Sequence, residues 1–466
     1  MKYDVIVGNP PFQDKAKRNT TPHKIWIEFT HKVFDNLEDG GALLWVSPAS
    51  WGSPSSKVLQ YFWQYQVPNI DLDTAEHFPG IGSTFSNYLV YKQNDDTTAT
   101  EFTKNGATFS AIIDDSVKYL GNDFCEHSFN IHKKVMFDTQ DKLPISYDYV
   151  TCHNVIRHTF KLHEKRIANT KKALQNATSA KATIRAQERL SRLINERSRL
   201  SVTISEHQTT KHRYPILHTN NKTWYSSIKQ DFLDKKKVMW SRSGYTKPFY
   251  DKGTKGCTDL GYYTTVASDT EGEILSHNLQ TKLFRYIFAT ARWSGFGNDK
   301  VFKMLPDLKT AKALSDSEIF KKFNITQAEQ AYIDKFLQPK KTKRKSKKNT
   351  TDSQTKSQNR IDNFGEVFTP QELVGQMLAA LKDECWQPGI KFLDPACGTG
   401  NFLVAVVEKK IEAGLSAKEA IKTTYGVDIM EDNIIECRRR INKLTNYAHI
   451  DLVAEQITHG NFLNNE

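Results

Sequence analysis

The sequence predicts an α/β protein whose main parallel sheet is assembled from both ends of the chain, with a mixed α+β region inserted between them. Short β-branched strands alternate with amphipathic helices over residues 1–95 and again over residues 364–466, while the residues between are more polar and irregular. Alternating strands and helices form a doubly wound sheet, and half of such a sheet leaves an edge unpaired. We therefore expect the two ends to complete one another.

The amino-terminal half supplies the first of these elements. Residues 3–7 are a short apolar run that ends at a glycine, as expected of a buried parallel strand. Apolar residues then recur at helical spacing over residues 25–37, and Gly40-Gly41 stops this helix before a strand over residues 42–46. The alternation continues in a helix over residues 58–63 and a strand over residues 87–92.

The carboxyl-terminal half repeats the pattern. It contains an apolar strand over residues 390–393, a helix over residues 400–410, a second strand over residues 424–428 and a second helix over residues 432–444. These are again strand-and-helix units, which matches the half sheet expected at the other end of the chain.

Length and composition narrow the class of protein. A chain of 466 residues exceeds one ordinary domain, and its net charge of +12 favours a polyanionic partner, of which nucleic acid is the commonest. The six cysteines form no C-x-x-C pair, which argues against a zinc knuckle or a disulfide framework. No segment has the apolar length of a membrane span or the pattern of a secretory signal, so we expect a cytoplasmic protein.

The first chemical motif is Asn9-Pro10-Pro11-Phe12, directly after the first predicted strand. The two prolines fix φ and make the loop rigid, so it can present fixed hydrogen-bond acceptors. An exocyclic adenine amine is a poor nucleophile, and the Asn9 oxygen and Pro10 carbonyl could accept its two N–H hydrogens. The ring of Phe12 could stack on a base extruded from a duplex. A strand-terminating turn with a core phenylalanine is the alternative interpretation.

The second motif lies where the strand at residues 390–393 enters the helix at residues 400–410. It reads Asp394-Pro395-Ala396-Cys397-Gly398-Thr399-Gly400, and its glycines allow a ligand to approach the backbone. Without a Gly-Lys-Ser/Thr ending a triphosphate is not expected, whereas a carboxylate here suits the cationic methionine part of S-adenosylmethionine. Asp428 ends the next strand, where such an acid accepts hydrogen bonds from ribose hydroxyls.

With these motifs the chain resembles the N6-adenine DNA methyltransferases of restriction–modification systems and bacteriophages, which carry an N-P-P-[FYW] catalytic loop. The resemblance implies a Rossmann-like class I methyltransferase sheet and a flipped adenine as the methyl acceptor. In the third cofactor motif of the family an acid usually precedes an aromatic, but here Asn461 precedes Phe462. An aromatic near the loop, Phe85 or Tyr88, would help to hold the flipped base. The implied cofactor-binding residues are Phe368, Thr369, Pro370, Asp394, Ala396, Gly398, Gly400, Asp428, Ile429, Asn461 and Phe462.

The order of the motifs predicts a circular permutation. The family commonly runs from the cofactor half into the catalytic loop and then into a target-recognition region, whereas here the cofactor half comes last. We expect a catalytic half over residues 1–95, a target-recognition region over residues 96–336, a basic flexible linker over residues 337–363 and the cofactor half over residues 364–466. The basic run at residues 340–348 would be a nuclear signal only in a eukaryotic or viral setting.

The middle region contains two candidate DNA-contact sites. Arg242 and Tyr245 at one site, and Arg292 and Trp293 at the other, mix basic and aromatic side chains in a way that suits DNA. A core hairpin with surface arginines explains them equally well. Residues 158–206 predict one or two long helices, which could clamp phosphates or pack on a second subunit as a homodimer, with a solvated spacer as the simplest interpretation.

We therefore expect a DNA adenine-N6 methyltransferase that binds double-stranded DNA, uses S-adenosylmethionine and needs no metal. We expect no cleavage activity. Three alternatives stay open: a methyltransferase for RNA or for protein glutamine with the same loop, an enzyme for the N4 of cytosine, and a non-catalytic DNA-binding subunit.

Overall fold

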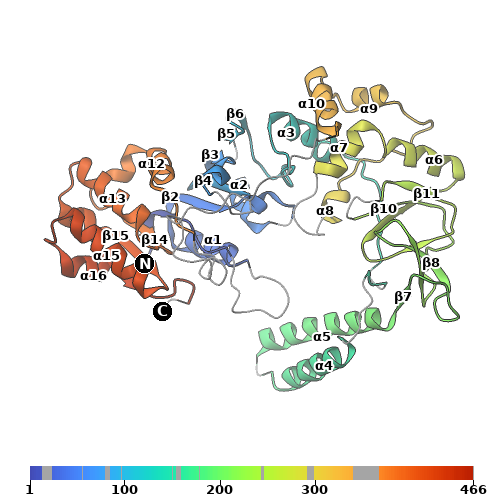
Figure 1. The fold of residues 1–466 in the computed structure, drawn as a ribbon, viewed down its shortest axis with the longest axis horizontal. Helices are drawn as coiled ribbons and strands as arrows, with labels where there is room; N and C mark the ends of the chain where they lie inside the picture. The colour runs from blue at the N-terminus through green and yellow to red at the C-terminus, as the bar shows by residue number, and fades with distance from the viewer. Residues whose placement is uncertain are drawn as a thin grey trace. The chain divides into compact units, whose positions relative to one another are not determined.

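The computed structural model describes residues 1–12, 24–54, 56–78, 84–95, 97–148, 151–153, 159–177, 179–242, 246–290, 299–339 and 367–464. The chain forms two compact units. Unit 1 contains Met1–Tyr119, Phe124–Glu126 and Lys341–Glu466, and unit 2 contains Leu120–Asp123 and His127–Lys340. Both ends of the chain therefore belong to unit 1 (Figure 1).

The core of unit 1 is one sheet with the strand order β16-β15-β14-β1-β2-β4-β3-β5-β6. The strand β1 (Tyr3–Gly8) lies between β14 (Phe392–Asp394) and β2 (Leu37–Pro48) and runs parallel to both. Beyond β14, the strands β15 (Thr424–Asp428) and β16 (Ile457–His459) continue in the same direction. The prediction that the two chain ends share a sheet is thus confirmed by the pairing of β1 with β14.

The other edge of the sheet is partly antiparallel. The strand β4 (Phe85–Asn94) is antiparallel to both of its neighbours, β2 and β3 (Tyr65–Asp71). β5 (Thr100–Lys104) runs parallel to β3, and β6 (Ala107–Ala111) closes the edge as a hairpin. The sheet therefore extends past residue 95, which the sequence suggested as the end of this half.

Helices cover both faces of the sheet. On one face, α12 (Gln371–Ala379) and α13 (Asn401–Glu412) pack on Val5 and Val7 of β1. On the other face, α1 (Ile25–Asn36) and α2 (Lys57–Gln64) cover the central strands, with Trp45 of β2 donating a hydrogen bond to Thr30 of α1. The remaining helices of the cofactor half, α14 (Ala417–Lys422), α15 (Glu431–Leu444) and α16 (Ile450–Gln456), bury a second apolar cluster with α13. Short 3-10 turns occur at Ala49–Gly52, Thr74–His77 and Asp383–Trp386.

The end of α1 differs from the prediction. The helix ends at Asn36, and β2 already begins at Leu37, which pairs with Tyr3. The predicted stop signal, Gly40-Gly41, lies instead at an irregularity inside β2, where Gly40 has φ +81°. The apolar spacing up to Leu37 was therefore misassigned, because the buried Leu37 is the first residue of β2 and not the last of the helix.

Unit 2 is a mixed α+β unit. It contains a three-stranded sheet, β11-β10-β13, and a four-stranded sheet, β12-β8-β9-β7. The strands are β7 (Ile204–Ser205), β8 (Tyr214–Leu217), β9 (Thr223–Ser226), β10 (Lys237–Ser241), β11 (Phe249–Asp251), β12 (Gly256–Cys257) and β13 (Gly261–Thr265). The helices outside the long hairpin are α3 (Glu126–His132), a π-helical turn (Lys133–Phe137), α6 (Asp269–Asn278), α7 (Lys282–Thr290), α8 (Asp299–Phe302), α9 (Asp316–Lys322) and α10 (Gln327–Leu337).

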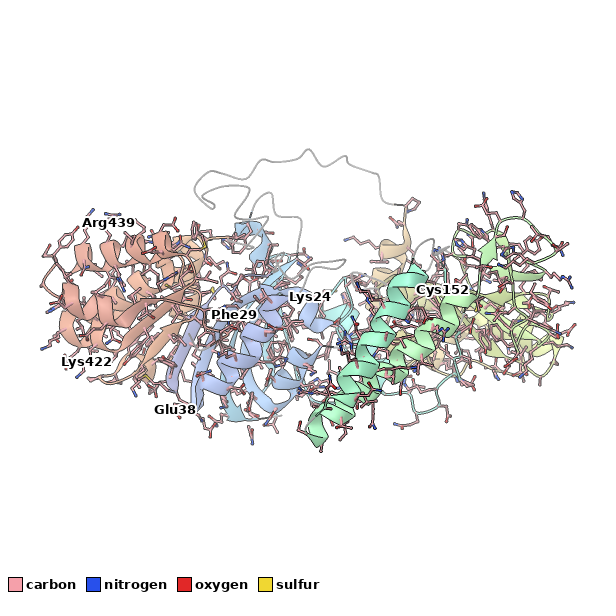
Figure 2. All side chains as sticks on the ribbon, turned by 90° about the horizontal axis from the view of Figure 1, so that it is seen from below. Lys24, Phe29, Glu38, Cys152, Lys422 and Arg439 are labelled. Atoms are coloured by element: carbon pink, nitrogen blue, oxygen red, sulfur yellow. The ribbon has the colours of Figure 1, made fainter. Side chains whose placement is uncertain are left out.

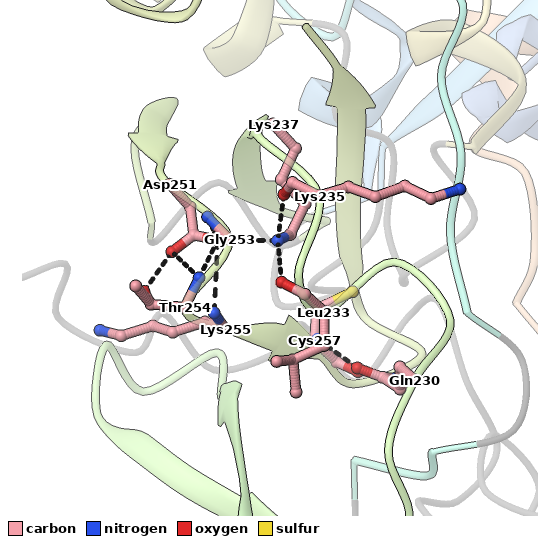
Figure 3. Close-up of polar contacts among 9 residues, drawn as sticks. All are labelled: Gln230, Leu233, Lys235, Lys237, Asp251, Gly253, Thr254, Lys255 and Cys257. Atoms are coloured by element: carbon pink, nitrogen blue, oxygen red, sulfur yellow. Dashed lines mark hydrogen bonds and ion pairs between the residues drawn. The ribbon is translucent and has the colours of Figure 1, made fainter. Parts of the chain in front are cut away.

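A buried ion pair organises the first of these sheets (Figure 3). Lys237 of β10 has no exposed side-chain surface, and its Nζ lies 2.7 Å from Asp251 Oδ2. The same ammonium donates to the carbonyls of Leu233 and Lys235, and Asp251 accepts backbone hydrogen bonds from the turn at Gly253–Lys255. Because both charges have several partners, the pair fixes the turn after β11.

Residues 159–201 form two long antiparallel helices, α4 (Thr159–Gln175) and α5 (Ala180–Ser201) (Figure 1). Ile167 and Leu193 are buried, and His163 Nε2 lies 2.7 Å from the Leu193 carbonyl. An ion pair joins Arg197 to Glu164 at 2.6 Å. The helices predicted in this region are therefore a hairpin. No helix in the described parts of the chain has both the length and the apolar composition of a membrane span.

Candidate functional site

The candidate site lies at the carboxyl ends of β14 and β1. From β14 the chain proceeds outward to β15 and β16, whereas from β1 it proceeds to β2 on the other side. Ligands of open α/β sheets bind at such a switch point. The two strands approach closely here, because a Cβ on Gly8 would lie 3.0 Å from Asp394 Oδ1. The catalytic motif and the glycine loop, far apart in sequence, therefore start side by side.

The side chain of Asn9 is anchored by the segment that precedes α12. Its Nδ2 donates to the Val367 carbonyl and to Thr369 Oγ1, each at 3.1 Å. A carbonyl oxygen can only accept, so this contact requires the amide nitrogen of Asn9 to face Val367 and the oxygen to face the other way. The network thus fixes which end of the carboxamide is presented to a ligand.

The other end of this carboxamide, Asn9 Oδ1, is buried and accepts no hydrogen bond within the described part of the chain. A buried acceptor without a partner costs roughly 1–3 kcal/mol, so native proteins retain few of them. Such an atom is suited to accept an N–H from a ligand. Asn9 Oδ1, which the N-P-P-F motif singled out as a candidate acceptor, is therefore a buried oxygen with free acceptor capacity among the described residues.

The structure distinguishes the two aromatic candidates near the loop. Phe85 lies 5.0 Å from Phe12, measured between ring centroids, and Phe78 supports Phe85 from behind at 5.1 Å. Tyr88 is fully buried on the opposite face of β4, against Trp51 and Phe62. A contact between Tyr88 and a flipped base is wrong for this structure because the ring lies in the core. Phe85 is also buried, so it can only support Phe12.

Two glycines shape the loop between β14 and α13. Gly398 and Gly400 have φ of +54° and +86°. Residues other than glycine rarely adopt such left-handed backbone conformations. A Cβ on Gly398 would lie 3.1 Å from the ring of Phe368, and one on Gly400 would lie 2.5 Å from Cys437 Sγ. The loop is therefore held between the segment before α12 and helix α15.

Two carboxyl groups lie beside this loop. Asp394 accepts from the backbone N–H of Ala396, and Asp428 accepts from that of Gly398. Burial, and secondarily the neighbouring Asp428 carboxyl, raises the pKa of Asp394 to about 8. Asp428 Oδ1 also accepts from the N–H of Met430, so both of its oxygens already bond to protein groups. Asp394 accepts fewer hydrogen bonds than Asp428, so its ionised form is the less stabilised of the two and would gain more from a nearby cation.

The third cofactor segment follows β16. Asn461 Oδ1 accepts from the Leu463 N–H at 3.0 Å, which makes a local turn. Phe462 stacks on Phe29 of α1 with ring centroids 6.0 Å apart. Figure 2 labels Phe29 on this helix. Ile429, the other apolar candidate, is 55% exposed and lies directly after β15.

Three residues of the site region were not identified from the sequence. Val367 supplies a carbonyl to Asn9, and Phe29 supports Phe462. Lys32 places its ammonium 5.1 Å from the Phe462 centroid and donates to the Leu463 carbonyl. Of these three residues, only Phe29 and Lys32 could have been connected from the sequence, because their spacing of three places them on one face of α1.

The DNA-contact candidates of the middle region are mostly outside the described residues. This applies to Tyr245, Arg292 and Trp293. Arg242 follows β10 and donates its backbone N–H to the Leu260 carbonyl at 2.7 Å. Within the described residues, His, Cys, Asp and Glu side chains do not gather in groups of three or more that would suit a metal ion.

The strand order and the position of the site at a switch point are those of a Rossmann-like methyltransferase fold. The family described as N-6 DNA Methylase matches residues 354–466, and the family described as Eco57I restriction-modification methylase matches residues 1–81. The two ends of the chain therefore each match a DNA methylase domain family, one of which is named for restriction–modification. A search of curated proteins found no match.

Solved structures of restriction–modification enzymes are also similar to this chain. The Type IIL enzyme MmeI in complex with DNA is 9% identical with a TM-score of 0.28, over 62% of this chain and 45% of that one. A nuclease-deletion mutant of the Type ISP enzyme LlaGI, with a DNA substrate mimic, is 10% identical with a TM-score of 0.30, over 72% and 42%. The type IIG restriction endonuclease BpuSI is 8% identical with a TM-score of 0.21, over 66% and 45%. The chain therefore spans less than half the length of these structures.

Proposed function

We propose that this chain transfers a methyl group from S-adenosylmethionine to the N6 amine of an adenine flipped out of duplex DNA. The observation that carries the proposal is the Asn9 carboxamide. Its Nδ2 is held by Val367 and Thr369, and its Oδ1 is a buried acceptor without a partner among the described residues. This is the arrangement required to accept one N–H of a planar amine.

The Asn9 oxygen addresses the chemical difficulty of the reaction. The lone pair of an exocyclic adenine amine is delocalised into the ring, so the nitrogen is a weak nucleophile until its hydrogens are engaged. In the proposal Asn9 Oδ1 accepts one hydrogen and the Pro10 carbonyl accepts the other, which draws the nitrogen toward tetrahedral geometry. Both acceptors sit in a proline-fixed loop, so little reorganisation is needed during the reaction.

Phe12 is proposed to stack on the flipped base. One side of its ring is supported by Phe85, which is in turn supported by Phe78. A base stacked on an aromatic side chain gains roughly 1–3 kcal/mol, which is of the same order as the cost of unstacking it from a duplex. The supported ring would therefore hold the base in plane with the Asn9 carboxamide.

The residues at the glycine loop fit S-adenosylmethionine. The loop presents backbone without side chains at Gly398 and Gly400. Asp394, whose pKa burial raises to about 8, suits the cationic methionine part. Asp428 and Ile429 would face the ribose and the adenine, with Phe462 as a further stacking surface and Phe368, Thr369, Pro370, Ala396 and Asn461 completing the site. The cofactor supplies the methyl group on a sulfonium, which is a good leaving group, so the chain contributes orientation and proximity.

Duplex DNA is the proposed acceptor because the family acts on DNA and the chain carries a net charge of +12. Unit 2 is the proposed target-recognition region. RNA, protein glutamine and the N4 of cytosine also offer planar nitrogens of similar geometry. The test therefore has to distinguish duplex DNA adenine from these alternative methyl acceptors.

The test is methyl transfer from labelled S-adenosylmethionine to four acceptors in parallel: unmethylated duplex DNA of varied sequence, single-stranded DNA, RNA and a protein extract. We expect label in duplex DNA, and nucleoside analysis should find N6-methyladenine. Label in RNA or protein alone would contradict the proposal, and so would N4-methylcytosine as the product. Measurable cofactor binding without transfer to any acceptor would indicate a non-catalytic subunit.

A further inference from the structure

A chain of hydrogen bonds connects helix α15 to the catalytic loop. Asn9 Nδ2 donates to Thr369 Oγ1 at 3.1 Å, and Asn401 Nδ2 donates to the Thr369 carbonyl at 2.8 Å. Arg440 Nη1 then donates to Asn401 Oδ1 at 2.6 Å. The four residues come from the catalytic loop, the segment before α12, the first turn of α13 and the middle of α15.

We propose that Asn401 and Arg440 are positioning residues that hold the Asn9 carboxamide in its reactive orientation. The inference deepens the proposed function and rests on it, because the reactive orientation is the one that methyl transfer requires. Neither residue lies within the motifs that the sequence analysis identified as chemical. Both act through Thr369 and are not expected to touch the target base.

The direction of each hydrogen bond in the chain is fixed by chemistry. A guanidinium can only donate, so Arg440 must face the oxygen of the Asn401 carboxamide. The nitrogen of Asn401 is then turned toward the Thr369 carbonyl, which can only accept. A bond from a charged donor is stronger than one between neutral groups, and Thr369 is only 4% exposed, so water competes little with these contacts. Arg440 thereby determines the placement of Thr369, and Thr369 determines that of Asn9.

The same arginine holds the glycine loop. Arg440 Nη1 donates to the Thr399 carbonyl at 2.8 Å. One turn earlier on α15, Cys437 lies against Gly400, where a Cβ would be 2.5 Å from the sulfur. Helix α15 therefore holds the loop at two adjacent points. Because Asn401 directly follows this loop, the cofactor loop and the Asn9 side chain share one support.

The sequence of α15 contains its own controls. Arg438 donates to the carbonyls of Ile457 and Ala454, so it ties α15 to the neighbouring helix and strand. Arg439 pairs with Glu436 on the exposed side of the helix (Figure 2). Arg440 alone among these three contacts the loop through Thr399 and Asn401. Loss of Arg438 should destabilise the helix without moving Asn9, and loss of Arg439 should do neither.

The experiment compares the full chain with Arg438→Ala, Arg439→Ala, Arg440→Ala and Arg440→Lys, in methyl transfer to duplex DNA and in equilibrium binding of S-adenosylmethionine. We expect Arg440→Ala to lower kcat by about 10- to 100-fold, because small displacements of a reacting group are costly. The Kd of the cofactor should rise by a smaller factor, because Cys437 still packs against the loop at Gly400. Arg440→Lys keeps a cationic donor and should recover most of the turnover. Arg438→Ala should lower Tm at unchanged kcat, and Arg439→Ala should change neither.

Asn401→Asp provides a second test. The carboxylate retains the partner of Arg440 but cannot donate to the Thr369 carbonyl, so kcat should fall although Arg440 remains paired. An unchanged kcat in Arg440→Ala, measured per folded protein, would overturn the proposal. So would a weaker cofactor affinity at unchanged kcat, because that result would limit Arg440 to supporting the loop.

A structural measurement separates this inference from the proposed function. If the natural chain transfers no methyl group, the proposed function fails, and crystal structures of the chain and of Arg440→Ala then decide the inference. A rotated Asn9 carboxamide in the variant supports the positioning role. An Asn9 side chain that keeps its bonds to Val367 and Thr369 contradicts it.

Discussion

At the scale of single residues, the account depends on two polar side chains whose surroundings are unusual. Asn9 presents a buried oxygen without a partner among the described residues, and Asp394 is a buried carboxyl beside another carboxyl, Asp428. Such groups cost stability and are retained where function uses them. Both lie at the carboxyl edge of adjacent strands, β1 and β14.

The raised pKa of Asp394 leads to a prediction about proton release. Burial raises this pKa to about 8, so at pH 7 the carboxyl is mainly protonated in the free protein. A cationic cofactor should favour the ionised form, so its binding at pH 7 should release up to about one proton. Calorimetry in buffers of different ionisation enthalpy measures this number. Asp394→Asn should abolish the release, and equal values for both proteins would refute the assignment.

The raised pKa of Asp394 also predicts how the stability of the fold changes with pH. The folded pKa of Asp394 lies above the value of about 3.9 in an unfolded chain, so the folded state holds more protons between these two values. The contribution of this group to stability is therefore complete below about pH 4 and is lost as the pH rises through 8. Asp394→Asn should flatten this part of the pH dependence of Tm.

At the scale of elements, the glycine loop illustrates how α13 and α15 define the cofactor side of the site. Gly400 begins α13 with a left-handed φ of +86°, and its missing side chain admits Cys437 of α15. The loop geometry and the packing of two helices thus depend on one position. Asp428 adds a third tie by accepting the Gly398 N–H.

Substitution at this position should therefore have a large effect. Gly400→Ala must adopt a left-handed conformation, which costs roughly 1–2 kcal/mol, and must also displace Cys437. We expect a lower Tm and weaker cofactor binding. The matched control is Gly375→Ala in α12, where a Cβ meets nothing within 4 Å and helix propensity improves. If Gly400→Ala were as stable as this control, the loop would not be constrained as described.

Replacing charged residues on the α4–α5 hairpin can show whether this element contacts DNA phosphates. Arg185, Arg189 and Arg192 are exposed on α5 at a spacing of four and three, so they share one helix face. If that face contacts phosphates, changing all three to Gln should reduce the slope of log K against log salt by up to about 2.7 for duplex DNA. Changing Lys321, Lys322 and Lys335, exposed on α9 and α10, removes the same charge and should leave the slope unchanged.

The other interpretations of the hairpin predict different results. If α5 instead packs on a second subunit, the arginine variant should change the sedimentation behaviour and not the salt dependence. A solvated spacer predicts no change in either measurement. Equal slopes for both triple variants would therefore exclude α5 as a phosphate contact.

At the scale of the whole molecule, the sequence predicted that both chain ends share one sheet, but it did not predict how far that sheet extends. Regular strand-and-helix alternation identified β1, β14 and β15 and placed both chain ends in one sheet. β3 was missed because Pro68 interrupts its pattern, and β16 because three residues are too few to show a period. The circular permutation of the motif order remains a prediction.

In the candidate site, too, some residues could be predicted from the sequence and others could not. Asn9, Asp394, Gly398 and Gly400 were identified because each belongs to a contiguous motif. The anchoring of Asn9 by Val367 joins residues 358 positions apart, and the Arg440 contacts join separate helices, so no local pattern could reveal them. Contacts of this kind depend on tertiary structure alone.

The most direct test of the account is the rate and product of methyl transfer by Asn9→Ala compared with the natural chain. The account predicts that the natural chain forms N6-methyladenine in duplex DNA. The variant should bind S-adenosylmethionine normally but react at least about 100-fold more slowly, because an oriented acceptor is lost. An unimpaired variant, or a product other than N6-methyladenine, would contradict the role assigned to Asn9.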